Sequence, residues 1–287
     1  MTKMSAFHPF PTIEFMDMTA FQWKIGAVSY LNTLPLVQGM DAAAEVASLE
    51  FDLPSRLADR LSLGQIDVAL IPSIEVFQNP AYTIVSNACI ACRGPVWSVK
   101  LMSRVPVERI KSLALDEGSR TSVALVRLLL DRQCSIRPEL MTLPIESRWQ
   151  AAPTDAVLII GDRAMNPDAD RDFPVEIDLG QWWYEETGLP FVFAMWTARP
   201  GIPQEELDRI GHCLSTSRDA GVRMAGEIAA GNALRYGLSV QQATDYFRKY
   251  LHFTLEVEER NALNRFREMA SQLNLAPPTL QLQYHDC

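Results

Sequence analysis

The sequence has few of the residues that usually carry metal or acid–base chemistry. It contains four histidines and five cysteines among 287 residues. Cys89 and Cys92 have CxxC spacing, but no second pair and no histidine lies near them, so we interpret them as reduced thiols and not as zinc ligands. The histidines fall in terminal or helical segments, and no P-loop or GxGxxG motif is present. We therefore expect neither a metal nor a cofactor.

Long apolar runs and clusters of basic residues are also missing. No stretch approaches the roughly 20 apolar residues of a membrane span. Lys3 is not followed by a continuous apolar region, so no secretory signal is predicted and we expect a cytoplasmic protein. The formal net charge of −9 and the absence of a Lys/Arg run argue against nucleic acid as a partner. We expect a small-molecule substrate, no nucleic acid and no membrane.

Strand-like and helix-like segments alternate along most of the chain, whose hydrophobic content is 48%. We expect strands at 24–28, 46–53, 66–71, 113–115, 138–144, 156–160 and 191–197, with two more between 82 and 105. Helices are expected from Pro54 to Gly64, at 123–130 and at 178–186, and throughout the chain after Pro203. This alternation is typical of α/β proteins with parallel sheets.

A break near 106–112 divides the predicted strands into two sheets, which indicates two α/β lobes with a ligand cleft between them. We assign residues 1–23 to a poorly ordered N-terminal extension, 24–110 to the first part of lobe 1, 111–195 to lobe 2, and 196–287 to the return into lobe 1 with the C-terminal helices.

Polar residues follow the first buried strands at the points where those strands end. Ser29, Asn32 and Thr33 come after the strand at 24–28, and Ser73 comes after the strand at 66–71. In open α/β sheets, ligands bind in the crevice outside the carboxyl ends of the strands, so these residues are candidates for a site. The alternative is that Asn32 and Thr33 only cap the helix expected after Pro35.

A second candidate site is the segment Gly118-Ser119-Arg120-Thr121-Ser122, which leads into a helix. A glycine and hydroxyl residues at a helix start present free backbone N–H groups and the positive end of the helix dipole, which together favour an anion. Arg120 adds a cation, although its long side chain can equally point to solvent. The alternative is plain N-capping by Ser119 or Thr121.

Six blocks of sequence, taken together and in order, resemble the chorismate dehydratases of the futalosine route to menaquinone. The resemblance covers about residues 24–270, and the blocks are SYLNTLP (29–35), DVALIPS (67–73), RGPVWS (93–98), SRTS (119–122), LIIGD (158–162) and GLPFVFA (188–194). It implies a two-lobed fold like the type 2 periplasmic binding proteins, used as a carbon–oxygen lyase (a hydro-lyase) that converts chorismate into 3-[(1-carboxyvinyl)oxy]benzoate.

The resemblance also implies roles for single residues. Asn32 matches the asparagine of the family's S-Y-L-N block and is the catalytic candidate, and Ser98 matches the serine that closes the G-P-V-x-S block. Cys92 departs from the serine that often precedes R-G-P-V in the family. The expected substrate-binding residues are Ser73, Ser98, Ser119, Arg120, Thr121, Ser122, Gly161 and Asp162.

Two other functions use the same fold. One is a binding protein that captures a small anion without turnover, which is expected to carry a signal sequence. The other is 1,4-dihydroxy-6-naphthoate synthase, the neighbouring enzyme of the same route, which is expected to use a histidine in its site. No histidine here lies at a predicted strand end.

Overall fold

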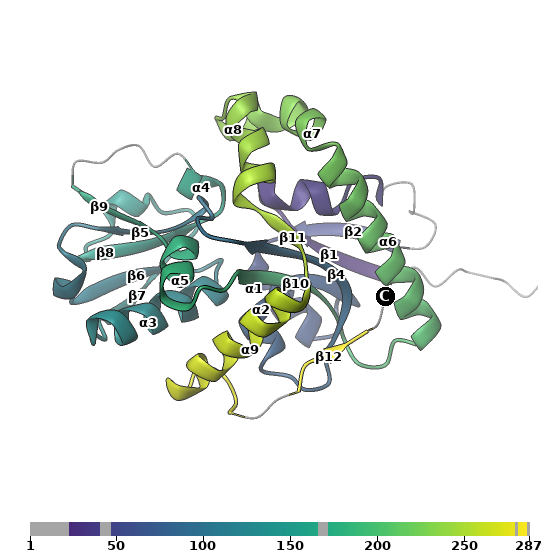
Figure 1. Ribbon diagram of the computed structural model, residues 1–287, viewed down its shortest axis with the longest axis horizontal. Coiled ribbons are helices and arrows are strands. Elements are labelled where there is room, and N and C mark those ends of the chain that lie inside the picture. Colours follow the sequence, from purple (N-terminus) through teal and green to yellow (C-terminus); the bar gives the residue numbers. More distant parts are fainter. Residues whose placement is uncertain (1–22, 41–46, 166–171, 279–280, 286–287) are drawn as a thin grey trace, which may run out of the picture.

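The structure is a computed structural model that describes residues 23–40, 47–165, 172–278 and 281–285. The predicted N-terminal extension lies outside the described residues up to position 22. Two sheets form the framework, one on the left and one in the centre and right of Figure 1.

The first sheet has the strand order β11-β4-β10-β3-β1-β2, with β12 beside β4. Its strands are β1 (Trp23–Val28), β2 (Ala47–Asp52), β3 (Val68–Pro72), β4 (Thr83–Cys92), β10 (Phe191–Ala198), β11 (His252–Thr254) and β12 (Gln283–Tyr284). Strand β1 pairs in parallel with β2 and β3, whereas β10 runs antiparallel to β3 and β4. Every residue of β3 and β10 is buried, as their central positions require.

The second sheet has the order β7-β6-β8-β5-β9. Its strands are β5 (Val99–Ser103), β6 (Ser112–Asp116), β7 (Glu139–Leu143), β8 (Ala156–Ile160) and β9 (Val175–Asp178). Strand β6 pairs in parallel with β7 and β8, but β5 is antiparallel to β8 and β9. The expectation of parallel sheets was therefore wrong for β5, β10 and β11, which run antiparallel to their neighbours.

Two strands belong to a different sheet from the one that the predicted lobe boundaries imply. Strand β5 falls within 24–110 but belongs to the second sheet, and most of β10 falls within 111–195 but belongs to the first. The predicted break at 106–112 is a short 3₁₀ segment inside the second sheet's part of the chain, η3 (Val107–Arg109). We propose that the lobes change at the two crossings, between β4 and β5 and between β9 and β10.

Helices cover both sheets and the ends of the molecule. They are α1 (Pro54–Ser62), α2 (Ser73–Val76), α3 (Thr121–Cys134), α4 (Asp162–Met165), α5 (Leu179–Thr187), α6 (Gln204–Arg223), α7 (Ala225–Asn232), α8 (Val240–Asp245) and α9 (Val257–Gln272). Shorter helical segments are the 3₁₀ helices η1 (Leu31–Leu36), η4 (Trp149–Ala151) and η5 (Ala233–Tyr236), and the π-helix η6 (Tyr246–Tyr250). The chain after Pro203 is not wholly helical, because β11 and β12 join the first sheet.

Local sequence explains several of these elements. Helix α1 begins at Pro54, whose fixed φ suits the first helical position, and buries Leu57 and Leu61 four residues apart. Helix α5 is capped by the Asp178 carboxylate and ends at Gly188, which has a φ of +68°. Among the described residues, no helix is both long and apolar enough to cross a membrane.

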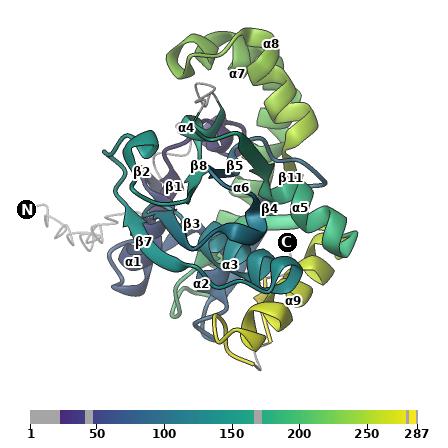
Figure 2. The same cartoon turned by 90° about the vertical axis from the view of Figure 1, so that its left-hand side faces the viewer.

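An aromatic cluster ties the elements at the junction of the two sheets. The ring centroid of Phe191 lies 5.2 Å from that of Trp183 on α5 and 4.9 Å from that of Phe266 on α9. Each of these three side chains is almost fully buried. Helices α7 and α8 lie together at the top of Figure 1 and of Figure 2. The core thus continues from one sheet to the other along β10.

Candidate functional site

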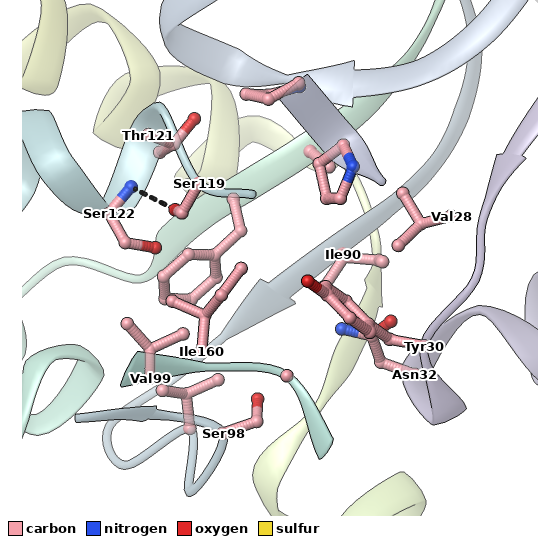
Figure 3. Close-up of a pocket in the computed structure, with 16 residues that line it drawn as sticks. Val28, Tyr30, Asn32, Ile90, Ser98, Val99, Ser119, Thr121, Ser122 and Ile160 are labelled. Carbon is pink, nitrogen blue, oxygen red and sulfur yellow. Dashed lines mark hydrogen bonds between the residues drawn. The ribbon is translucent and has the colours of Figure 1, made fainter. Parts of the chain in front are cut away.

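A pocket lies between the two sheets and receives side chains from both. Concave sites between lobes of this kind are common binding sites for small ligands. The first sheet and its connections supply Val28, Tyr30, Asn32, Pro54, Pro72, Ile90, Phe193 and Ala194. The second sheet and its connections supply Val96, Ser98, Val99, Ser119, Thr121, Ser122, Ile160 and Gly161. Six of the nine predicted site residues therefore meet in one pocket (Figure 3).

Asn32 reaches the pocket from η1, directly after β1. Tyr30 is the residue that precedes this helix, and no side chain caps it, so Asn32 lies inside the helix and does not cap it. The amide Oδ1 of Asn32 accepts a hydrogen bond from the Thr33 hydroxyl at 3.3 Å. The side chain of Asn32 also interacts with the hydroxyl of Tyr246.

Ser98 lies just before β5, in the part of the pocket lining that the second sheet and its connections supply (Figure 3). Its Oγ accepts a hydrogen bond from the Tyr246 hydroxyl at 2.8 Å. The preceding backbone is held by the partly buried carboxylate of Asp178, which accepts from the N–H groups of Val96 at 3.0 Å and Trp97 at 2.6 Å. Trp97 has a φ of +66°, so these bonds fix a turn that a large side chain rarely adopts.

Ser119, Thr121 and Ser122 surround the start of α3. The Oγ of Ser119 accepts from the backbone N–H of Ser122 at 3.2 Å, which is a capping bond (Figure 3). The Oγ1 of Thr121 accepts from the N–H of Ile74 at 3.3 Å and lies 3.3 Å from the Oγ of Ser73. The turn is therefore bonded to the first turn of α3 and also lines the pocket, and its contact with an anion stays a prediction.

Three predicted site residues lie outside the pocket lining. Ser73 is buried and donates its hydroxyl to the carbonyl of Val192 at 2.8 Å. Arg120 forms ion pairs with Asp59 at 2.8 Å and Glu75 at 3.2 Å, both on the first lobe. These partners could not be predicted from local sequence, because both carboxylates are more than 40 residues away from Arg120.

Asp162 is the third residue outside the lining, and it joins the two sides of the pocket. Its Oδ1 accepts a hydrogen bond from the backbone N–H of Leu31, the first residue of η1, at 3.0 Å. Burial raises the pKa of this carboxyl from 3.8 to about 6. A bond between α4 and η1 holds the lobes together next to Asn32.

Comparison with known proteins places the chain in a family. Residues 23–272 match the family described as "Menaquinone biosynthesis". The chain belongs to this family. It is 29% identical over 274 residues to the chorismate dehydratase of Thermus thermophilus, covering 85% of this chain and 97% of that one. It is 27% identical over 247 residues to the chorismate dehydratase of Campylobacter jejuni, covering 86% of this chain and 93% of that one.

Solved structures of similar fold confirm the predicted architecture. A protein from Archaeoglobus fulgidus has a TM-score of 0.75 at 17% identity, with coverage of 88% of this chain and 98% of that one. The periplasmic aliphatic sulphonate binding protein of Escherichia coli has a TM-score of 0.60 at 14% identity, with coverage of 89% and 88%. This member of the menaquinone biosynthesis family therefore has a two-lobed fold like the periplasmic binding proteins.

Tyr30 is a pocket residue that sequence reasoning did not select. Its hydroxyl is buried and has no hydrogen-bond partner among the described residues. Its ring packs on the second lobe, where a Cβ added at Gly161 would come within 3.0 Å of the ring carbons and one at Gly118 within 3.0 Å of the hydroxyl. Burial raises the pKa of this phenol, so it is neutral near pH 7. The sequence feature that could have identified Tyr30 as a pocket residue is its position inside the SYLN block.

The pocket carries no fixed charge from its described lining residues, which include no Lys, Arg, His, Asp or Glu. Arg163 is the nearby cation on α4, and it donates from Nε to the buried carboxylate of Asp116 at 3.0 Å. That carboxylate also accepts from the N–H of Gly118 at 3.0 Å. These charges are matched within the protein. A ligand in the pocket therefore meets a largely apolar wall, in which the polar groups are the amide of Asn32 and the hydroxyls of tyrosine, serine and threonine side chains.

One cluster outside the pocket has metal-ligand chemistry. Ligand atoms of His252, Glu256 and Glu259 lie within 4.8 Å of one another. The guanidinium of Arg93 already donates to Glu259 at 2.9 Å and to Glu256 at 3.3 Å. The two glutamates also form the capping box of α9. Their positions are explained by this structural role.

Proposed function

We propose that this chain is a chorismate dehydratase, a hydro-lyase that removes water from chorismate to give 3-[(1-carboxyvinyl)oxy]benzoate in menaquinone biosynthesis. The two relatives above, both chorismate dehydratases, support this activity over most of the chain. The observation that carries the proposal is the single pocket that unites Asn32 with the hydroxyls of Ser98, Ser119 and Ser122. The family resemblance selects Asn32 and Ser98, and the sequence pattern at the start of α3 selects Ser119 and Ser122.

The chemistry suits a pocket without a strong base. The hydrogen on C3 of chorismate is acidified through the conjugated ring carboxylate, and loss of the C4 hydroxyl produces an aromatic ring. The C3 proton and the C4 hydroxyl leave together as one water, so no oxidant or reductant is needed. The protein must mainly orient the substrate, exclude water and stabilise developing charge.

We assign Asn32 to hydrogen bonding at the reacting centre. An amide is a poor base, and the titratable side chain among the described lining residues is the phenol of Tyr30, which burial keeps neutral. The substrate's own enolpyruvyl carboxylate is then the proton acceptor within the site. Asn32 stabilises the negative charge that develops as the C3 proton leaves.

The substrate carboxylates are assigned to the hydroxyl-lined parts of the pocket. The start of α3 offers the positive end of a 14-residue helix together with the side chains of Ser119 and Ser122. Ser98 supplies a further hydroxyl to the pocket. Hydrogen bonds to a charged group are worth about 1.5–3 kcal/mol each, so a few donors suffice for binding.

The test is to incubate the purified protein with chorismate and to follow the aromatic product by ultraviolet absorbance and mass spectrometry. We expect loss of one water per chorismate, at a rate that is proportional to protein concentration and above that of a protein-free control. Tight binding of chorismate without turnover would overturn the proposal in favour of a binding protein. No binding and no turnover would overturn both.

A further inference from the structure

Tyr246 links the two principal residues of the pocket without lining it. Its side chain is 1% exposed and lies at the start of η6, the π-helix that continues α8. The hydroxyl donates to the Oγ of Ser98 at 2.8 Å and also interacts with the side chain of Asn32. Three segments far apart in the sequence therefore converge on one phenolic oxygen, and π-helical turns are frequent at functional sites.

The hydrogen-bonding capacity of a phenol determines which groups donate and which accept among Asn32, Tyr246 and Ser98. Tyr246 has one O–H, which it donates to Ser98, so it accepts from Asn32. Only the amide nitrogen of Asn32 can donate, which turns Nδ2 toward Tyr246 and leaves Oδ1 to accept from the Thr33 hydroxyl. One N–H of Asn32 then remains for a ligand. The hydroxyl hydrogen of Ser98 is likewise free to donate into the pocket.

Packing around Tyr246 restricts its movement. The ring of Trp97 stands edge-on to the ring of Tyr246 with centroids 5.6 Å apart, and it also contacts the ring of Tyr250 at 5.6 Å. Trp97 is itself held through its backbone N–H by Asp178. Packing thus holds the phenolic oxygen of Tyr246 in one position relative to the side chains of Asn32 and Ser98.

We propose that Tyr246 is a positioning residue that sets the amide of Asn32 and the hydroxyl of Ser98 as paired donors toward the substrate. The proposal rests on the function proposed above, because it concerns the same pocket. Tyr246 does not touch the reacting atoms and acts through its two partners. Without its hydroxyl, the amide of Asn32 keeps only the 3.3 Å bond from Thr33, and the hydroxyl of Ser98 loses its fixed orientation.

The kinetic test compares Tyr246→Phe with Tyr250→Phe. The first change removes the hydroxyl and keeps the ring that packs on Trp97, and the second removes a hydroxyl from the same helix without touching Asn32 or Ser98. We expect Tyr246→Phe to lower kcat by about 10- to 100-fold and to change KM by less than about threefold, since the orientation of the donors matters most in the transition state. Tyr250→Phe should keep both constants. Wild-type kcat in Tyr246→Phe would overturn the proposal.

A double-mutant cycle separates positioning from a general structural effect. In an Asn32→Ala, Ser98→Ala background, Tyr246→Phe should lower kcat/KM by less than about twofold, because its partners are already absent. An equal loss in both backgrounds would mean that Tyr246 acts independently of them. This result would also overturn the proposal.

A crystallographic comparison tests the same inference without depending on turnover. In Tyr246→Phe, we expect the amide of Asn32 or the hydroxyl of Ser98 to leave the position that it holds in the wild type and in Tyr250→Phe. Unchanged positions of both groups would overturn the positioning role. Failure of the wild type to convert chorismate would overturn the proposed function instead, and the two failures are therefore distinguishable.

Discussion

At the scale of single residues, Asn32 is the side chain on which the proposed chemistry depends most. We predict that Asn32→Ala lowers kcat by roughly 30- to 1000-fold, equivalent to the loss of about 2–4 kcal/mol of transition-state stabilisation. The free energy of unfolding should change by less than about 1 kcal/mol, because Asn32 lies inside η1 and does not cap it. Steady-state kinetics and urea denaturation measure the two quantities. Near-normal turnover would contradict the assigned role.

Asp162 is predicted to make stability depend on pH. Its folded pKa of about 6 lies above the ordinary value of 3.8, so the folded protein binds this proton more tightly than the unfolded chain. The stabilisation is present in full below about pH 4 and is lost as the pH rises through 6. Asp162→Asn keeps an oxygen that can accept from Leu31 and carries no charge.

The variant Asp162→Asn should therefore match the wild type near pH 4 and exceed its free energy of unfolding by roughly 1–3 kcal/mol at pH 8. Urea denaturation of both proteins at several pH values checks this difference. A difference that is independent of pH would show that the buried charge of Asp162 is not its cause.

At the scale of elements, the position of Asn32 depends on close packing between η1 and α6. Gly221 on α6 lies so near to η1 that a Cβ there would come within 1.9 Å of the carbonyl oxygen of Pro35. We predict that Gly221→Ala destabilises the protein by about 1–3 kcal/mol, because the clash is with backbone and one element must move. Turnover should fall as well, since η1 carries Asn32.

Gly231→Ala on α7 is the matched control for that change. A Cβ at Gly231 would meet nothing within 4 Å, so this helix should gain roughly 0.5–1 kcal/mol from alanine. Thermal unfolding and kcat of the two variants give the comparison. Equal stability of Gly221→Ala and the wild type would mean that η1 and α6 can separate without loss.

Elements with a clear local signal could be predicted from the sequence. Helix α1 has a proline start and leucines four residues apart, and β8 is an unbroken apolar run. Strand β11 has three residues and forms because it pairs with β4. The residues that stabilise it therefore lie about 160 positions earlier in the sequence. The link from Tyr246 to Asn32 and Ser98 was unpredictable for the same reason. Local patterns identify segments, whereas long-range contacts select which side chains meet.

At the scale of the whole molecule, the net charge of the protein disfavours binding of an anionic substrate, whereas the hydrogen-bond donors in the pocket favour it. The formal net charge of −9 repels a dianionic substrate at long range. The described residues that line the pocket include no lysine or arginine to offset this repulsion. Attraction must therefore come from short-range donors such as Ser98, Ser119 and Ser122 in a pocket between two lobes. Hydrogen bonds in such a site are screened by salt much less than exposed ion pairs.

From this arrangement we predict that KM for chorismate depends only weakly on ionic strength. Between about 0.05 and 0.5 M salt, the Debye length falls from more than 10 Å to a few ångströms, which removes the long-range repulsion and leaves the pocket contacts in place. We expect KM for chorismate to change by less than about threefold and in the downward direction. Initial rates in sodium chloride and in a second salt with a bulkier anion separate screening from competition by chloride. A rise in KM of tenfold or more in both salts would mean that exposed cations hold the substrate outside this pocket.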